Sequence, residues 1–115
     1  MDKLNKYRQV IRNLLEEFTT RHYANPEILQ LSNKTVFDPI HDRYLVISEG
    51  WNKDYSRIHG CLIDIAIIDG KIWIQQDGTD YGIANDLITT GITKDEIVLG
   101  FKEPSIRPHT GFATA

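Results

Sequence analysis

The chain has 115 residues, of which 41% are hydrophobic and 25% charged, and 13 basic against 16 acidic side chains leave a formal net charge of −3. This length predicts a single domain spanning 1–115, and the composition is that of a globular protein without long disorder. The acidic balance gives no support to a nonspecific nucleic-acid binder, which is normally basic overall. The single cysteine, Cys61, excludes an internal disulfide and favours a reducing, cytoplasmic setting.

The sequence shows no evident targeting signal and no evident membrane-spanning segment. The first six residues lack the apolar core of a signal peptide. The longest apolar run is interrupted by Asp64 and is much shorter than the roughly 20 residues that span a bilayer. We therefore expect a cytoplasmic protein.

The first predicted element is an amphipathic helix. Its apolar stripe recurs at helical spacing and comprises Leu4, Tyr7, Ile11, Leu14, Leu15 and Phe18. Asp2 is placed to accept hydrogen bonds from the first free backbone amides, and Asn25-Pro26 predicts the end of the helix. The stripe favours packing across a sheet, and a coiled-coil partner helix is the alternative.

Two strands are predicted before the centre of the chain. A weak strand signal covers 29–37, and a turn cluster at 38–42 separates it from a clear strand at 44–49. A second turn region at 50–56 leads into the central strand, which runs from 57 to 68. Connections this short predict an antiparallel meander.

An Asp-Gly pair at 69–70 predicts a type I′ hairpin, and the turn sets the register of the two strands around it. The register places Ile68 opposite Lys71, Ile67 opposite Ile72 and Ile65 opposite Ile74, so one face of the hairpin is apolar. That predicted core face comprises Cys61, Ile63, Ile65, Ile67, Ile72 and Ile74. The opposite face comprises Leu62, Asp64, Ala66, Ile68, Lys71, Trp73 and Gln75.

Trp73, opposite Ala66 on that mixed face, allows two interpretations. An amphipathic tryptophan among small and polar neighbours is suited to anchor a protein contact. The alternative is that the C-terminal tail folds over it.

Short elements follow the hairpin. Thr79 or Asp80 is expected to cap a helix over 83–90, and Gly91 stands where a left-handed residue ends a helix. The sequence at 93–96 fits a capping box, 97–99 resembles a last strand or packed turn, and the tail from 103 is expected to be irregular and extended. The predicted fold class is therefore α+β: an N-terminal helix packed on an antiparallel sheet of about four strands, with one or two short C-terminal helices.

No catalytic or metal-binding motif is evident. The four histidines lack metal-site spacing, and one cysteine cannot build a structural zinc site. The sequence at 77–80 could hold a cation in principle, but the rest of a calcium loop is missing, so a turn with a helix cap is favoured. Nucleophile elbows and phosphate-binding glycine loops are not seen. We expect no catalytic residues, no cofactor and no metal.

Seven ordered blocks of sequence carry a resemblance to a known family. They are DKLNKYR at 2–8, GCLI at 60–63, DGKIWI at 69–74, DGT at 77–79, GIA at 82–84, IVLGF at 97–101 and TGFA at 110–113. Together they resemble the XisI family, whose members are called fdxN-element excision controlling factors. The resemblance implies a small α+β protein, not an enzyme, that acts in the control of excision of a DNA element. It also implies a companion protein, XisH, whose own family looks nuclease-like.

Two functions from different classes remain open. The first is a regulator that binds a nuclease-like partner of the XisH type. Its candidate partner-binding residues are aromatic, arginine or histidine side chains: Trp51, Trp73, Arg107, His109 and Phe112. Trp51 and Phe112 are equally suited to the core.

The second function is an architectural factor that binds recombination sites directly. Its candidate contacts are basic side chains on the first helix or near the tail: Lys3, Lys6, Arg8, Arg12, Lys102, Arg107 and His109. Glu16 and Glu17 follow the helix set closely, which favours a solvated face over a DNA-binding stripe. Self-association is a further option, because an open sheet leaves free edges.

Overall fold

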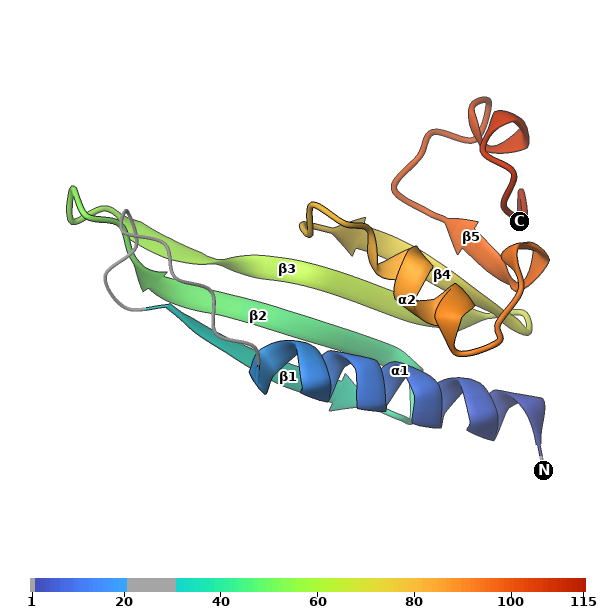
Figure 1. Cartoon of the computed structure of the whole chain (residues 1–115), viewed down its shortest axis with the longest axis horizontal. Helices are drawn as coiled ribbons and strands as arrows, with labels where there is room; N and C mark the ends of the chain where they lie inside the picture. The colour runs from blue at the N-terminus through green and yellow to red at the C-terminus, as the bar shows by residue number, and fades with distance from the viewer. Residues whose placement is uncertain (1, 21–30) are drawn as a thin grey trace.

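The computed structural model describes residues 2–20 and 31–115 (Figure 1). Helix α1 (Lys3–Thr20) precedes four strands, β1 (Ser32–Asp38), β2 (Arg43–Trp51), β3 (Arg57–Ile68) and β4 (Lys71–Asp77). The chain continues through α2 (Ile83–Thr89), the 3₁₀ turn η1 (Lys94–Glu96), β5 (Ile97–Leu99) and the 3₁₀ turn η2 (Arg107–His109). The predicted helix end at Asn25-Pro26 and the first residues of the strand predicted over 29–37 lie outside the described residues.

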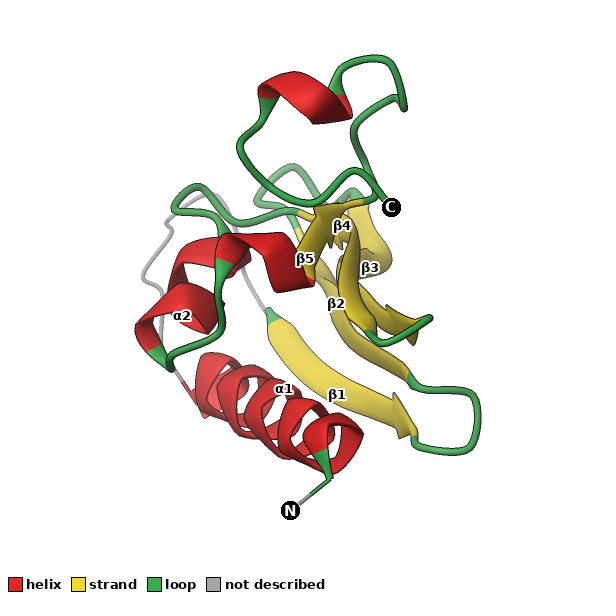
Figure 2. Ribbon diagram, turned by 90° about the vertical axis from the view of Figure 1, so that its right-hand side faces the viewer, coloured by secondary structure: helices red, strands yellow, loops and turns green. Residues whose placement is uncertain are grey.

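The strands form one sheet in chain order, and both helices lie on the same face of it (Figure 2). The predicted α+β class is confirmed. The sheet has five strands instead of about four, and β5 runs parallel to β4. The segment containing α2 makes this parallel pairing feasible, because parallel neighbours need a crossover connection. In the described ranges no helix combines the length and apolar character that a membrane span requires.

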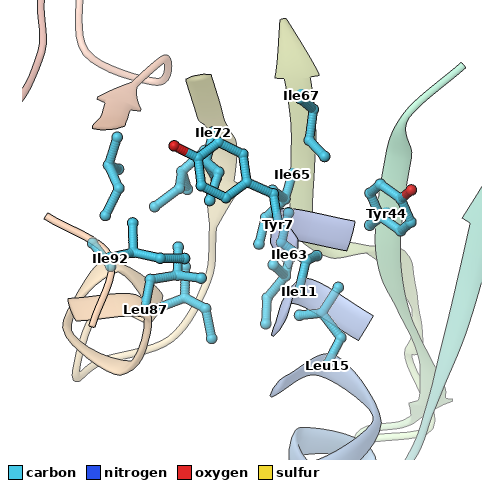
Figure 3. Packing of buried hydrophobic residues seen from close by; sticks show 14 of the residues in the cluster. Tyr7, Ile11, Leu15, Tyr44, Ile63, Ile65, Ile67, Ile72, Leu87 and Ile92 are labelled. Carbon is cyan, nitrogen blue, oxygen red and sulfur yellow. The ribbon is translucent and has the colours of Figure 1, made fainter. Parts of the chain in front are cut away.

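Helix α1 covers the sheet with the predicted stripe. Tyr7, Ile11, Leu15 and Phe18 are buried, and Leu4 and Leu14 pack against the same core. Figure 3 shows the side chains of α1 among the isoleucines of β3. The backbone amide of Leu4 donates to Asp2 Oδ1 at 3.1 Å, as expected for a helix start. The stripe therefore packs on the sheet, and the prediction of a sheet-covering helix is confirmed.

Polar contacts hold α1 at two points. Arg8 donates from Nε and Nη2 to the two carboxylate oxygens of Asp42 at 2.7 and 3.0 Å, and the Tyr44 hydroxyl donates to Asp42 Oδ1 at 3.1 Å. The hydrogen bond from Arg8 holds the pKa of Asp42 below its usual range. At the preceding residue, the Tyr7 hydroxyl donates to Glu96 Oε1 at 2.6 Å, which lowers the pKa of Glu96. Burial, together with this hydrogen bond, raises the pKa of Tyr7.

The central hairpin has the predicted turn and register. Asp69 and Gly70 both have positive φ, 50° and 76°, as a type I′ turn requires. Ile68 faces Lys71, Ile67 faces Ile72 and Ile65 faces Ile74. The five predicted isoleucines of the core face, from Ile63 to Ile74, are buried.

A β-bulge overturns the predicted position of Cys61. Val46 faces Ile63 while Ile47 faces Cys61, so Leu62 is an extra residue in β3. Leu62 packs against the core, and Cys61 falls on the opposite face with Ile47. The prediction assumed strict alternation along the strand, and the extra residue breaks it. Burial raises the pKa of the Cys61 thiol, which donates to the carbonyl of Ile63 at 3.2 Å.

The sequence predicts that Thr79 or Asp80 caps α2. In the structure Asp77 organises the start of this helix instead. A second bulge, at Gln75, places Asp77 opposite Ile63 on the core side. Asp77 Oδ1 accepts from the amide of Thr79 at 2.9 Å and from its hydroxyl, and Oδ2 accepts from the amide of Ile83 at 2.7 Å. The predicted cap was wrong because it assumed that a side chain adjacent to the helix must serve its amides.

The other predicted helix signals are confirmed. Gly91 follows α2 with φ 103°. The capping box of η1 is formed, with the amide of Thr93 donating to Glu96 Oε2 at 2.8 Å. Glu96 therefore serves both η1 and, through Tyr7, helix α1.

Asp77→Ala is expected to lower the free energy of unfolding by about 1–2 kcal/mol, because three donors lose their acceptor. Chemical denaturation measures the change. Asp80→Ala is the matched control, since Asp80 is exposed, and should change the free energy by less than about 0.5 kcal/mol. Equal losses in both variants would show that Asp77 is not the organising residue.

Arg8→Gln is expected to destabilise the fold at neutral pH, because Asp42 loses a charged hydrogen-bond donor. The folded-state pKa of Asp42 lies below the value of about 4 in the unfolded chain. Its contribution is therefore complete above about pH 4 and is lost as the pH falls through the lowered pKa. The difference between wild type and Arg8→Gln should shrink on acidification, as urea unfolding at several pH values can measure.

Arg12→Gln is the control for this experiment, since the Arg12 guanidinium contacts the amide of Gln9 at 3.5 Å. Its effect on stability should be small at every pH. An Arg8→Gln effect that stays constant from neutral to acidic pH would contradict a role for the Asp42 charge.

Candidate protein interface

Trp73 is covered by the C-terminal tail. It stands opposite Ala66 and beside Val98 on the face of the sheet away from the helices. The guanidinium carbon of Arg107 lies 5.2 Å from the centre of the Trp73 ring. Arg107 also donates to the backbone carbonyl of Lys102 at 3.0 Å, so its side chain is held by the tail itself. Of the two interpretations of Trp73, the structure shows the folded tail.

The sequence predicts an extended tail. In the structure the tail instead coils through turns and η2 back to the sheet (Figure 1). The amide of Phe101 donates to the carbonyl of Ile74 at 3.2 Å, and the amide of Ala113 donates to the carbonyl of Ile97 at 2.9 Å. These two contacts fix both ends of the tail, and the segment between them folds into a loop.

The remaining predicted residues of the tail differ in exposure. Phe112 is half-buried against the core, with the ammonium group of Lys94 5.7 Å from its ring centre. His109 is exposed at the end of η2. Trp73, Arg107 and Phe112 are therefore engaged mainly in contacts within the chain.

Trp51 lies in a different part of the molecule. Trp73 pairs with Ala66, which pairs with Arg43, and Trp51 is the last residue of the same strand as Arg43. At about 3.3 Å per residue the two tryptophans are roughly 25 Å apart along the sheet. The structure therefore does not bring the five predicted residues together in one site.

Trp51 is 42% exposed and forms a pair with Arg57 across the end of the β2–β3 hairpin. The guanidinium carbon of Arg57 lies 4.9 Å from the Trp51 ring centre, and Arg57 also donates to the carbonyl of Gly50 at 3.3 Å. Glu49 Oε2 is 3.9 Å from Arg57 Nη2. Arg57 was not predicted, although the five-residue connection at 52–56 could have indicated that it faces Trp51.

The turn at the tip of this hairpin presents Tyr55, which is 80% exposed. Hydrogen bonds across the turn hold its shape: the amide of Tyr55 donates to the carbonyl of Asn52 at 2.9 Å, and the amide of Asn52 donates to the carbonyl of Ser56 at 2.8 Å. Tyr55 itself has φ 69°, an uncommon conformation for a bulky residue. An aromatic side chain is thus held in solvent by a bonded turn.

The face of β1–β3 away from the helices continues from Trp51 and is called here the open sheet face. Along each strand the residues of this face alternate with those that point into the core. The open sheet face comprises Lys34, Val36, Arg43, Leu45, Ile47, Glu49, Trp51, Arg57, His59, Cys61 and Asp64. Apolar side chains occupy its centre, and Val36 is 50% exposed. Charges of both signs surround them, including the Arg43–Asp64 ion pair at 2.7 Å. This mixture suits a protein partner better than a phosphate backbone.

Four of the seven basic residues predicted as DNA contacts are engaged within the chain. Arg8 is bound by Asp42, and Lys3 lies 4.0 Å from Glu96. Near the tail, Arg107 stacks on Trp73 and Lys102 lies over Phe101. Across the described residues, no group of three or more histidine, cysteine, aspartate or glutamate side chains is placed to hold a metal ion.

Known proteins give a consistent result. The XisI protein family matches residues 1–114. The fold is similar to a XisI-like protein from Anabaena variabilis ATCC 29413, with a TM-score of 0.83 and 30% identity over 97% of this chain and 99% of that one. It is also similar to the fdxN element excision controlling factor XisI from the same organism, with a TM-score of 0.81 and 32% identity over 99% and 100% of the two chains.

No curated protein matches the sequence. The family match covers nearly the whole chain, and both solved structures agree with it in sequence and in fold. The chain therefore belongs to the XisI family.

Proposed function

We propose that this protein controls excision of a DNA element by binding another protein, a nuclease-like partner of the XisH type, and that it does so without catalysis of its own. The observation that carries the proposal is the open sheet face with Trp51 and Arg57 at its end. Tryptophan, tyrosine and arginine supply most of the binding energy in protein interfaces. Here Trp51, Arg57 and the nearby Tyr55 are exposed together.

The geometry of the face also supports a protein contact. Trp51 and Arg57 are already stacked, so a partner can bind them with little loss of side-chain freedom. The central apolar residues offer area for burial, and the flanking ion pairs provide a polar rim. The alternative, direct binding of recombination sites, needs a basic surface, and the described basic side chains on α1 include two with acidic partners.

Trp51→Ala should raise the Kd for an XisH-type partner by at least about tenfold, since a hot-spot residue contributes about 2 kcal/mol or more. Isothermal titration calorimetry of the purified pair measures the change, and circular dichroism checks the fold. Phe101→Ala is the matched control, because Phe101 is an aromatic residue of similar exposure, 46%, on the tail. Its Kd should equal that of wild type.

The salt dependence of binding separates the two functions. A packed protein interface should persist when the salt concentration is raised, whereas affinity for DNA should fall steeply. Absence of a complex with the partner, together with salt-sensitive binding of a duplex that carries the ends of the element, would overturn the proposal.

A further inference from the structure

Strand β3 has 12 residues and extends beyond its neighbour β4, which has 7. Pairing with β4 ends where Ile63 faces Asp77. Beyond that point the amide of Gly78 donates to the carbonyl of Leu62 at 2.8 Å, and the Gln76 side chain donates to the carbonyl of Cys61 at 2.7 Å. Among residues 2–20 and 31–115, only β2 pairs with residues 57–61 as a strand. Together with the end of β2 and the turn between them they form an arm that extends beyond β4 (Figure 1).

Gly60 lies in the middle of this edge, and the described part of the chain gives no local reason for a glycine there. Its φ is not positive, and a Cβ built on it would meet no described atom within 4 Å apart from its chain neighbours. It is part of a shallow hollow of about 220 Å³, lined by Ser48, Ile58, His59, Gly60, Cys61 and Leu62. A glycine inside a strand often marks the close approach of another chain.

We propose that the arm pairs with the arm of a second copy, so that the 57–61 edges of two β3 strands join antiparallel around a two-fold axis. Facing residues in such a pair must point to the same side of the sheet, so the axis passes through one residue position. Centring it on His59 pairs residues 57–61 of one copy with 61–57 of the other, and the carbonyl of Cys61 then accepts from the Arg57 amide of the other copy in place of the Gln76 side chain. Arg57 then faces Cys61 of the other copy, His59 faces its own counterpart, and Ile58 faces Gly60.

The pairing of Ile58 with Gly60 is the reason to choose a second copy as the occupant. Both residues lie on the core side of the strand, since they face Gly50 and Ser48 of β2. The side chain of Ile58 in one copy would therefore occupy the hollow beside Gly60 in the other, and the same contact occurs twice. No two lysine, arginine or acidic side chains face one another in this register, so no like-charge repulsion between such groups opposes it. The open sheet face remains free for a partner, so the dimer does not depend on the proposed function.

Gly60→Val tests the contact. Sedimentation velocity of wild type should show a concentration-dependent shift from the 13.2 kDa protomer towards twice that mass. Gly60→Val should remain a protomer, because its side chain fills the place of Ile58. At dilutions where wild type is also a monomer, its melting temperature should not fall, since the new side chain has open space and valine favours strands. Val36→Thr, on the distant strand β1, should dimerise like wild type.

A disulfide tests the register directly. In the double variant His59→Cys, Cys61→Ser, the two new cysteines face each other across the axis with Cα atoms about 4.5–5.5 Å apart, within the range of a disulfide. Mild oxidation should give a covalent dimer on a non-reducing gel. The control is Val36→Cys, Cys61→Ser. A wild type that stays monomeric at all concentrations, a Gly60→Val protein that dimerises as tightly as wild type, or crosslinking no faster than the control would each overturn the proposal.

Discussion

The packing of helix α1 on one face of the sheet is the interaction on which the rest of the structure depends. Its 18 residues make a helix of about 27 Å, whereas the 12 residues of β3 extend over about 40 Å. The described helix is therefore shorter than the longest strand. The core therefore gathers under α1 and α2 (Figure 3), and the β2–β3 hairpin continues beyond the end of β4. The open sheet face lies uncovered by α1 and α2 because both pack on the other face, and the arm exists because β3 is longer than its pairing with β4.

The parts of the fold that follow from local rules could be predicted from the sequence. A type I′ turn at Asp69-Gly70 fixes the register of β3 and β4, and a seven-residue spacing of apolar side chains fixes the buried face of α1. The two bulges could not be predicted, because one extra residue leaves the alternation of apolar residues almost unchanged. Leu62 and Gln75 are these extra residues, and they account for the wrong positions of Cys61 and of the α2 cap.

The candidate site could be predicted only in part. Of its two predicted locations, the core or the surface, Trp51 has the exposed one, and its role in binding stays a prediction. Trp73, predicted for the same interface, lies at a different end of the sheet. Whether an aromatic residue is covered depends on the path of the tail, and the tail has no repeating pattern from which its path can be derived. The sequence alone does not point to Arg57, because its candidacy rests on stacking on Trp51, a contact made across the hairpin.

The polar contacts of α1 explain how a small protein keeps this arrangement. Asp42 joins the first helix to the turn between β1 and β2, and Glu96 joins it to the segment before β5. Each carboxylate accepts hydrogen bonds from α1 and from a second segment of the chain. The β1–β2 turn and the segment before β5 are therefore both bonded to the same turn of α1.

The two tryptophans, each under an arginine but far apart, give the molecule two independent optical reporters. Trp73 lies beneath the tail, so its fluorescence depends on whether residues 100–113 stay folded on the sheet. Trp51 lies at the tip of the β2–β3 hairpin, where its emission responds to the water around the open sheet face. A spectrum of the native protein is therefore the sum of two environments. Replacing either indole by phenylalanine would separate the behaviour of the tail from that of the hairpin tip.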